Sequence, residues 1–572
     1  MGTMDSEAPA DSGRRRRDRL ILIALLSVAF VWRLGYFLEM EASPYRGSLT
    51  LDSEVYHETA VEVAHGRLSG GSTFYQAPLY PWALGLVYAV FGTSQTIAKL
   101  LQILLSVSSC WLIYRIARRV FDRSVAQVAL GISAVYGMFI YFSNELLVVT
   151  VIVFLDLLGL DLLLRAAADE RKILWAGAGV VFGFSAIARP TILPFVAVVC
   201  VWTAVSGWRS GKRLAALRAT IVFAAGAALP IAPVTLHNYL ADGDLVLIAA
   251  NGGFNFYIGN NPQSDGVTAA APGIRPDRGD AYSDQVQVAR QRLGRIDATP
   301  RQISDFWFGQ AWTYIRSAPA KALRHTAYKA FILFNAHEIS NNRVIEFVTR
   351  HSSIFSWATI RFWVVVPLAL AGCIVGGGQR RSTTLLLVFA VVSAATVVPF
   401  FINARFRMPV VSVLIIFAAA AVVSWFRWLR NQPLDWRRGR RVVASVIVAL
   451  VVAVAVRPLP ALKVPDAQAF FNEAEAYRMQ GDYASAARWY QRALEEYSGY
   501  CDAAYNLARI LTDIYPDPQR VVEVLEPAIG QCADDTGIRS LFGRALCAVG
   551  RCDEGSVHLE FAQQGQGTSD GF

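Results

Sequence analysis

Long apolar stretches recur along most of the chain, and they constrain its fold more than any other feature. About eleven of them read as membrane spans, with short arginine- and lysine-rich segments between them. Because the core of a bilayer offers no water to unpaired backbone groups, such stretches predict helices. We therefore predict an all-α bundle whose spans are residues 20–38, 96–114, 125–142, 146–164, 173–188, 191–208, 219–236, 355–375, 383–402, 409–426 and 442–456.

The basic segments give the predicted spans a direction. Loops rich in Arg and Lys stay on the cytoplasmic side of a membrane, and the segment RRRRDR at residues 14–19 precedes the first span. Alternation from there places nearly every dense basic cluster inside, with the N-terminus inside and the C-terminus outside. The first span is too long for a signal-peptide core, so we expect it to be retained. Residues 78–91 are too short to cross, which predicts a helix in the outer interface.

The same pattern divides the chain into parts. We expect a basic cytoplasmic N-terminus, a membrane domain, a linker and a soluble tail at residues 1–19, 20–456, 457–466 and 467–572. The membrane domain carries two long outer loops, residues 39–95 and 237–352. In the second loop, Thr299 and Pro300 predict the N-cap and the first residue of an amphipathic helix.

Composition excludes several classes of function. Hydrophobic residues make up 54% of the chain and charged residues 17%, which is too little polar surface for a soluble protein. The net charge of +10 comes from clusters between apolar stretches, so we expect no nucleic-acid partner. The sequence has no Walker or Rossmann glycine pattern, which argues against nucleotides as direct substrates. No His, Cys or Asp cluster has metal-ligand spacing; we assign no metal site, and a divalent cation remains an open question.

The tail changes to a soluble helical pattern at Pro458. The segment YRMQGDYASAARWYQRALEEY resembles the second half of a tetratricopeptide repeat. Ala474 occupies the small-residue position of that repeat, Ala508 follows 34 residues later, and Gly543 follows after another 35. About three repeats fit, enough for a stacked α-solenoid. Such a solenoid predicts a protein or glycan partner.

Cysteines are divided between the membrane domain and the tail. Three lie in predicted spans and read as small core residues: Cys110, Cys200 and Cys373. Four lie in the tail, and an even set in an exported domain suggests disulfides. Cys547 and Cys552 would face each other across a helix–turn–helix, and Cys501 and Cys532 would open and close one repeat. Buried free thiols are the alternative.

Carboxylates stand at the predicted outer ends of two spans. Asp52 and Glu54 follow the first span, and Glu145 lies at the outer end of the span of residues 125–142. A carboxylate at the interface suits general-base chemistry on a lipid-borne substrate. The alternatives are a solvated loop turn for the first pair and a helix-start carboxylate favoured by the helix dipole for Glu145.

Positive charge on the outer side departs from the positive-inside pattern and needs a reason. Capture of a phosphate or pyrophosphate leaving group is one reason, and snorkelling to lipid phosphates is the other. The arginines concerned are Arg33, Arg189, Arg405 and Arg407. Asp156 and Asp161 lie within a span; we interpret Asp156 as part of a structural pair, while Asp161 can reach the cytoplasmic face.

The order of these motifs resembles the GT-C class of membrane glycosyltransferases, close to family 39, which includes the protein O-mannosyltransferases and the bacterial aminoarabinose transferase of lipid A. The matching segments are LDSEVYH, APLYPW, SNELL, ARP and NARFRMP, and HNYL with NGGFNFYIGNNP resembles a subgroup that carries a tetratricopeptide tail. The acidic pair of that family is separated here by Ser53, so the choice between Asp52 and Glu54 stays open.

The resemblance implies transfer of a sugar from a polyprenyl-phosphate donor to a cell-envelope acceptor, on the outer face of a bacterial inner membrane and with inversion. Asp52 would take the acceptor proton, and Arg405 and Arg407, with Arg189 or Arg33, would stabilise the leaving phosphate. Glu145 would hold the acceptor or share a divalent cation with Asp52. The competing interpretations are a lipid or polysaccharide transporter or flippase, and a non-catalytic membrane anchor that presents a tetratricopeptide scaffold.

Overall fold

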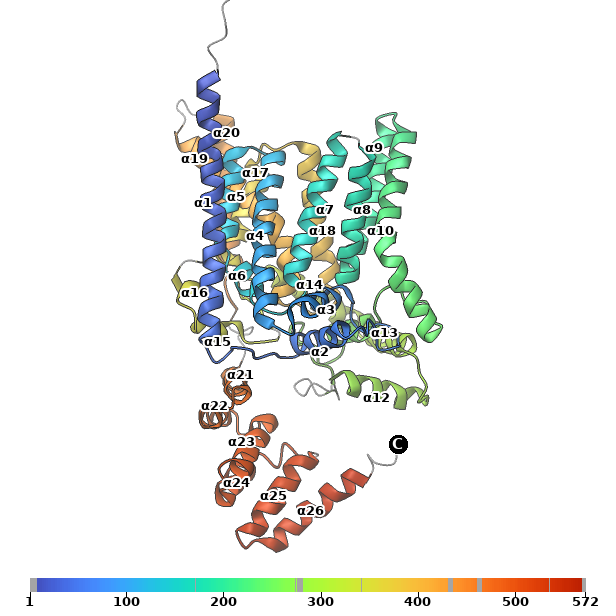
Figure 1. Cartoon of the computed structure of the whole chain (residues 1–572), viewed down its shortest axis with the longest axis vertical. Coiled ribbons are helices and arrows are strands. Elements are labelled where there is room, and N and C mark those ends of the chain that lie inside the picture. The colour runs from blue at the N-terminus through green and yellow to red at the C-terminus, as the bar shows by residue number, and fades with distance from the viewer. Residues whose placement is uncertain are drawn as a thin grey trace, which may run out of the picture. The chain divides into compact units, whose positions relative to one another are not determined.

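The fold is known from a computed structural model of the chain, drawn in Figure 1. It describes residues 8–169, 171–272, 274, 281–340, 342–357, 359–430, 436–459, 465–533 and 535–567. Within these residues every element is a helix, apart from one isolated parallel bridge between Tyr136 and Ile360. The prediction of an all-α protein is therefore confirmed. The chain forms two compact units, residues 1–37, 51–342 and 353–462 in the first and residues 38–50, 343–352 and 463–572 in the second.

Helices overlap all the predicted spans, although the span predicted at residues 355–375 is helical mainly from Phe362 and the one predicted at 383–402 ends at Val397. They are α1 (Ala8–Glu41), α4 (Gln95–Val120), α5 (Arg123–Ala134), α6 (Gly137–Ser143), α7 (Val149–Asp169), α8 (Lys172–Ala188), α9 (Leu193–Arg209), α10 (Arg213–Asp242), α17 (Phe362–Val375), α18 (Arg380–Val397), α19 (Met408–Arg430) and α20 (Trp436–Ala455). Figure 1 shows α4, α7 and α8 running side by side. In the described part of the chain, six helices are long and apolar enough to cross a membrane. The number of crossings thus stays a prediction.

The predicted span at residues 125–142 is interrupted. The chain is extended at Tyr136, between α5 and α6. There the Gly137 amide donates to the Ile360 carbonyl at 2.9 Å, and the Ile360 amide donates to the Val135 carbonyl at 2.9 Å. A single continuous helix was therefore the wrong expectation for this span. Backbone pairing with a segment far along the chain replaces two helical hydrogen bonds and breaks the helix.

Glycines bring α8 and α10 into backbone contact. A Cβ atom on Gly179 would lie 2.2 Å from the Phe223 carbonyl oxygen, and one on Gly226 would lie 2.6 Å from the Ala176 carbonyl oxygen. No larger residue fits at either position without separating the two helices. Small residues at helix contacts are typical of membrane bundles, where close packing replaces the hydrophobic effect between helices.

Shorter helices from the two outer loops gather at one end of the bundle. Figure 1 shows α2 (Asp52–Ala64), α3 (Leu79–Phe91) and α13 (Pro300–Ser317) at its lower end. Thr299 caps α13 through the Gln302 amide in a capping box, which confirms the predicted start. The remaining loop helices of the first unit are α11 (Gly252–Gly259), α12 (Ala281–Leu293), α14 (Pro319–Leu333) and α16 (Ser353–Trp357), whereas α15 (Ile345–Arg350) belongs to the second unit.

The tail is a chain of helices in which each contacts the next: α21 (Asp466–Met479), α22 (Tyr483–Glu496), α23 (Cys501–Asp513), α24 (Pro518–Leu525), α25 (Thr536–Ala548) and α26 (Cys552–Gly567). The small residues at repeat spacing lie at helix contacts. Ala474 and Ala508 are fully buried, and a Cβ on Gly543 would lie 2.7 Å from the Gly555 carbonyl oxygen. Both expected disulfides, Cys501–Cys532 and Cys547–Cys552, are present. Part of the predicted linker, residues 460–464, lies outside the described residues.

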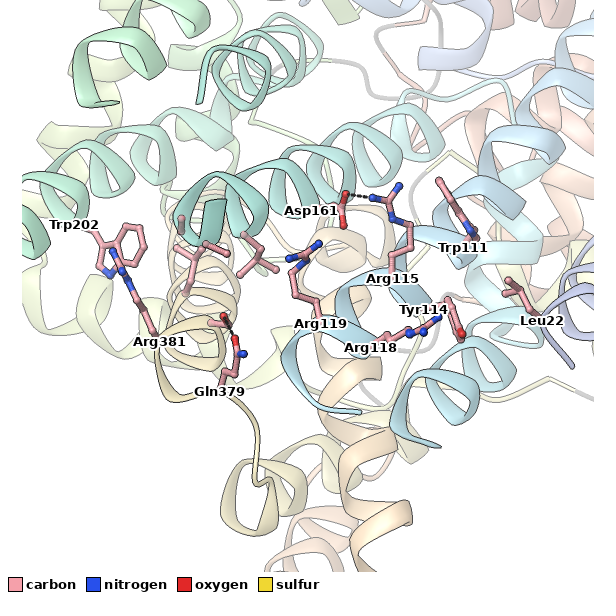
Figure 2. Close-up of a pocket in the computed structure, with 15 residues that line it drawn as sticks. Leu22, Trp111, Tyr114, Arg115, Arg118, Arg119, Asp161, Trp202, Gln379 and Arg381 are labelled. Atoms are coloured by element: carbon pink, nitrogen blue, oxygen red, sulfur yellow. Dashed lines mark hydrogen bonds and ion pairs between the residues drawn. The ribbon is translucent and has the colours of Figure 1, made fainter. Parts of the chain in front are cut away.

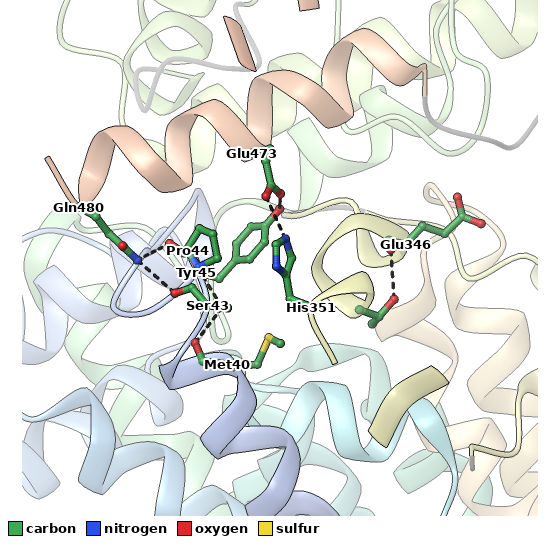
Figure 3. Close-up of polar contacts among 9 residues, drawn as sticks. Met40, Ser43, Pro44, Tyr45, Glu346, His351, Glu473 and Gln480 are labelled. Carbon is green, nitrogen blue, oxygen red and sulfur yellow. Dashed lines mark hydrogen bonds and ion pairs between the residues drawn. The ribbon is translucent and has the colours of Figure 1, made fainter. Parts of the chain in front are cut away.

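Within the second unit, hydrogen bonds hold α21 against two other segments, residues 38–50 and residues 343–352 with α15. Figure 3 shows the buried Glu473 carboxylate between Tyr45 and His351. The Tyr45 hydroxyl donates to Glu473 at 2.5 Å, and His351 Nε2 lies 2.9 Å from its other oxygen. Gln480 Nε2 also donates to the Pro44 carbonyl at 2.6 Å. These bonds connect the first tail helix to residues 38–50 and 343–352.

Candidate functional site

Three of the seven predicted site residues line one pocket of about 330 Å³ in the first unit: Asp52, Arg189 and Arg405. Asp52 begins α2, Arg189 precedes the short 3-10 helix η1 (Pro190–Ile192), and Arg405 lies in the 3-10 helix η2 (Ala404–Arg407). Residues of α11 and the end of α18 complete the wall. The pocket therefore joins both outer loops to two turns between spans.

Asp52 and Arg405, which both line this pocket, form an ion pair, although 353 positions separate them. One Asp52 oxygen accepts from Arg405 Nη1, and the other accepts from Gln76 Nε2 at 3.3 Å. Arg405 Nη1 also donates to Asn342 Oδ1 at 3.4 Å. Both carboxylate oxygens thus have donors, and the side chain is held in one orientation.

The backbone just before Asp52 is strained. Leu51, the N-cap of α2, has φ of 50° and ψ of −122°. A left-handed φ is uncommon for a residue with a Cβ, and such strain gathers at functional sites. The strained turn makes Asp52 the first residue of α2, where the positive end of the helix dipole favours a carboxylate.

The two pocket arginines share one aromatic ring. The guanidinium carbon of Arg189 lies 4.4 Å from the centre of the Phe406 ring, and that of Arg405 lies 5.0 Å from it. The Arg189 guanidinium makes no hydrogen bond or ion pair with any residue that the structure describes, and Arg405 Nε is buried without a partner there. Guanidinium groups with unused donors, stacked on a ring, suit a planar or tetrahedral oxyanion.

Tyr56 lines the same pocket and was missed by sequence reasoning. Burial, reinforced by the Asp52 charge, raises the pKa of Tyr56 to about 12, although Arg405 and Arg189 oppose the rise. Its hydroxyl is therefore neutral at ordinary pH and able to donate. The signal was present in the sequence, because Tyr56 follows Asp52 by four residues and shares its helix face.

The other two predicted carboxylates lie outside the lining. Glu54 is exposed on α2. It follows Asp52 by two residues, and residues two apart on a helix point to different faces. Glu145 is buried, and its backbone carbonyl accepts from Gln102 Nε2 at 2.8 Å. Val148, three residues further on, reaches the pocket instead. The geometry gives no support to a cation shared by Asp52 and Glu145.

Arg407 is buried in a structural network. It is 1% exposed and pairs with Glu338. Its guanidinium donates to the carbonyls of Asn335 and His337, each at 2.8 Å, and stacks on Phe362 at 4.0 Å. These acceptors lie just after the C-terminus of α14, where a cation is favourable. Arg407 does not line the pocket.

Arg33 has a similar position at the end of another helix. It is fully buried and donates to the carbonyls of Ala134 at 2.9 Å and Ser133 at 3.3 Å, at the C-terminus of α5. Its Nε donates to Ser106 Oγ at 2.8 Å. It compensates helix carbonyls that have no partner within α5. Like Arg407, it lies outside the pocket lining.

Lys329 supports the pocket wall and was also missed by sequence reasoning. Its fully buried ammonium donates to the carbonyls of Gly259 at 2.9 Å and Pro399 at 3.3 Å. Burial lowers the pKa of Lys329 to about 8. The two carbonyls belong to α11 and to the segment that leads into Phe400, a lining residue. Lys329 therefore positions the wall without contacting the cavity.

Two carboxylates inside α7 have partners away from the pocket lining. Asp156 accepts from Ser185 Oγ at 2.6 Å, and Asp161 pairs with Arg115 at 2.8 Å. In the described part of the chain, no three His, Cys, Asp or Glu residues lie close enough together to hold a metal ion.

Comparison with known proteins gives one family match. Residues 75–237 match the family described as dolichyl-phosphate-mannose-protein mannosyltransferase. This segment contains the APLYPW, SNELL and ARP motifs, and over it the resemblance to the GT-C class is confirmed. It contains Arg189, whereas Asp52 and Arg405 lie outside it. No curated protein matches the chain.

Two solved structures are similar to this chain at low identity. One is the archaeal oligosaccharyltransferase AglB from Archaeoglobus fulgidus in complex with an inhibitory peptide and a dolichol-phosphate, with 13% identity and a TM-score of 0.40 over 82% of this chain and 60% of the other. The second is the apo form of an oligosaccharyltransferase from the same organism, with 14% identity and a TM-score of 0.41 over 89% and 59%. This chain thus spans about 60% of the length of those proteins.

Proposed function

We propose that this chain transfers a sugar from a polyprenyl-phosphate-linked donor to a cell-envelope acceptor, and that the reaction takes place in the pocket lined by Asp52, Arg189 and Arg405. One observation carries the proposal. Arg189, whose guanidinium forms no ion pair with a described residue, stacks on the same ring as the Arg405 that holds Asp52. The family match supports glycosyl transfer in general. The donor class, the acceptor and the residue roles are our proposal.

Asp52 is the proposed general base. The acceptor hydroxyl or amine attacks the anomeric carbon, and the Asp52 carboxylate takes its proton. The bond between that carbon and the phosphate oxygen breaks, and its electron pair leaves with the phosphate. A single displacement of this kind inverts the anomeric centre, as the inverting glycosidases do.

The two arginines are the proposed site for the donor phosphate. Loss of the sugar adds one negative charge to that phosphate, and preorganised cations stabilise charge that develops in the transition state. The Arg189 guanidinium has no donor used by a described residue, and Arg405 has Nε without a described partner. When Arg405 turns from Asp52 to the phosphate, it leaves one Asp52 oxygen available to the acceptor. Donor binding would in this way prepare the base.

The pocket size agrees with a sugar phosphate. Its volume of 330 Å³ lies at the low end of small-molecule sites, which run from about 300 to 1,000 Å³. A polyprenyl chain is too large for it and would extend into the membrane. Phe254, Phe400 and Phe401 give the wall aromatic faces for a sugar ring.

The experiment that tests this function uses the purified full-length chain with a panel of radiolabelled polyprenyl-phosphate sugars and a membrane extract. We expect one donor to label an acceptor, and the label to disappear with the Asp52→Asn variant. A Glu54→Gln variant is the matched control, because Glu54 is exposed and lies outside the pocket lining. Absence of transfer from every donor by well-folded protein would contradict the proposal.

The tail has a separate proposed role. We propose that residues 467–572 form a tetratricopeptide unit that binds a protein or glycan partner on the outer side of a bacterial inner membrane. The buried small residues at 34- and 35-residue spacing support the repeat, and the two disulfides support an oxidising compartment. The test is a pull-down from envelope extract. Capture of the same partner by the full chain, but not by a chain truncated after residue 456, would support this role.

A further inference from the structure

A second pocket, of about 660 Å³, lies at the end of the bundle away from α2 and α3. Figure 2 shows α4 residues in its middle, with Trp202 and Arg381 on one side and Leu22 on the other. Its wall combines α4, α7 and α18 with single residues of α1 and α9. None of its lining residues belongs to the Asp52 pocket.

This second pocket is strongly basic. Its described lining includes four arginines and one carboxylate, a net charge of +3. Asp161 forms an ion pair with Arg115, at 2.8 Å between Oδ2 and Nη2. The guanidinium groups of the remaining three, Arg118, Arg119 and Arg381, make no hydrogen bond or ion pair with a described residue. The positive-inside pattern explains basic residues at this end of the chain, but it does not require three unpaired guanidinium groups around one cavity.

The wall of the second pocket is also aromatic, and two of its helices, α1 and α4, carry exposed apolar side chains. Trp111 is 39% exposed, and the Arg115 guanidinium lies 4.6 Å from its ring. Arg381 stacks on Trp202 at 4.9 Å. Next to Leu22 on α1, Ile23 is 60% exposed. Tryptophan beside arginine, next to apolar side chains that face outward, is the composition of a membrane interface at headgroup level.

We infer that the second pocket binds the phosphate group of an anionic phospholipid, whose acyl chains lie along the exposed apolar side chains of α1 and α4. A phospholipid headgroup and a free inorganic phosphate would both present a phosphate group to these arginines. The exposed apolar side chains on α1 and α4, the helices that carry Leu22 and Trp111 of the lining, favour the lipid, because a free phosphate gains nothing from them. Basic pockets between membrane helices are suited to acidic headgroups. This site is independent of sugar transfer at Asp52.

The test measures lipid retention by the detergent-purified full-length chain with native mass spectrometry. Phosphatidylglycerol, phosphatidylcholine and inorganic phosphate are added in separate arms. We expect retention of phosphatidylglycerol over phosphatidylcholine and no binding of inorganic phosphate at the same concentration. The double variant Arg118→Gln/Arg119→Gln should weaken phosphatidylglycerol binding about 25-fold, which is about fivefold for each cation near a headgroup.

The matched control removes two arginines at the same end of the bundle that do not line the pocket, with Arg209→Gln/Arg380→Gln. It should retain phosphatidylglycerol as the unaltered chain does. Equal retention of both lipids, an equal loss in the control, or inorganic phosphate binding as tightly as the lipid would each overturn the inference. Size-exclusion profiles of both double variants establish that they are folded. The variant Arg118→Gln/Arg119→Lys, which keeps the charge at position 119, should recover part of the phosphatidylglycerol affinity that Arg118→Gln/Arg119→Gln loses.

Discussion

Replacement of Asp52 by Asn is the sharpest test of the chemistry proposed for the first pocket. The variant removes proton acceptance and nearly preserves shape. Its amide oxygen can still accept from Arg405 Nη1, and its NH2 group can donate to Gln76 Oε1, which has no described partner, once the Gln76 amide turns over. General-base catalysis contributes about 10² to 10⁴ in rate. Turnover should fall by that factor, which corresponds to about 3 to 5 kcal/mol of transition-state stabilisation.

A loss of folding is too small to account for such a fall. The Asp52 side chain is 25% exposed and its Arg405 partner 11%, and the variant keeps one hydrogen bond of the pair. Exchange of a partly buried charged hydrogen bond for a neutral one costs about 1 kcal/mol. Thermal unfolding of the purified variant measures this cost directly, and donor retention by the variant separates binding from chemistry.

The assay is the initial rate of radiolabelled sugar transfer, measured for Asp52→Asn, Glu54→Gln and the unaltered chain at saturating donor. We expect Glu54→Gln to transfer at close to the normal rate, since Glu54 lies outside the pocket. If Asp52→Asn is active and Glu54→Gln is not, the base is Glu54. If both variants transfer sugar normally, the catalytic interpretation of the first outer loop is wrong and the transporter or scaffold alternatives gain.

Four further predictions address the arginines, the tail and the topology. Arg189→Gln should lower kcat by about 10²-fold, because it removes one donor from the site of developing charge; an unchanged rate would exclude Arg189 from the phosphate site. Arg407→Lys should instead destabilise the fold, by about 3 kcal/mol, because it disrupts a buried pair with Glu338, and the measurement is the unfolding temperature; normal stability with lost turnover would return Arg407 to the catalytic group. Truncation after residue 456 should keep donor turnover and weaken acceptor recruitment, whereas complete loss of turnover in a folded truncation would mean that the tail completes the active site. A reporter that fluoresces only in the cytoplasm, fused after Phe572, should stay dark, and bright cells would reverse the predicted topology.

The features of this chain that could be predicted from its sequence are those that depend on neighbouring residues. Apolar length alone specified where the helices run, because a bilayer accepts little else. The Thr299-Pro300 pair specified the start of α13, since a cap depends on four neighbouring residues. The disulfide pairs followed from repeat spacing, because each joins cysteines at the ends of one short helical unit.

The break between α5 and α6 could not be predicted in the same way. Residues 125–142 read as one apolar span, and nothing within them marks Tyr136 as extended. The cause is the bridge to Ile360, which belongs to another part of the chain. A local pattern contains no information about a backbone partner that distant.

The sequence by itself determined that acids and arginines gather at one end of the bundle, since spans of fixed direction bring their outer ends together. Only the tertiary structure decided which of them meet. Arg405 and Arg407 stand two residues apart in one 3-10 helix, whose three residues per turn point them to different sides. Arg405 reaches Asp52, whereas Arg407 reaches Glu338 and the carbonyls that follow α14. The physical reason is that charge type and membrane side are local properties, while the partner of a charge depends on packing across hundreds of residues.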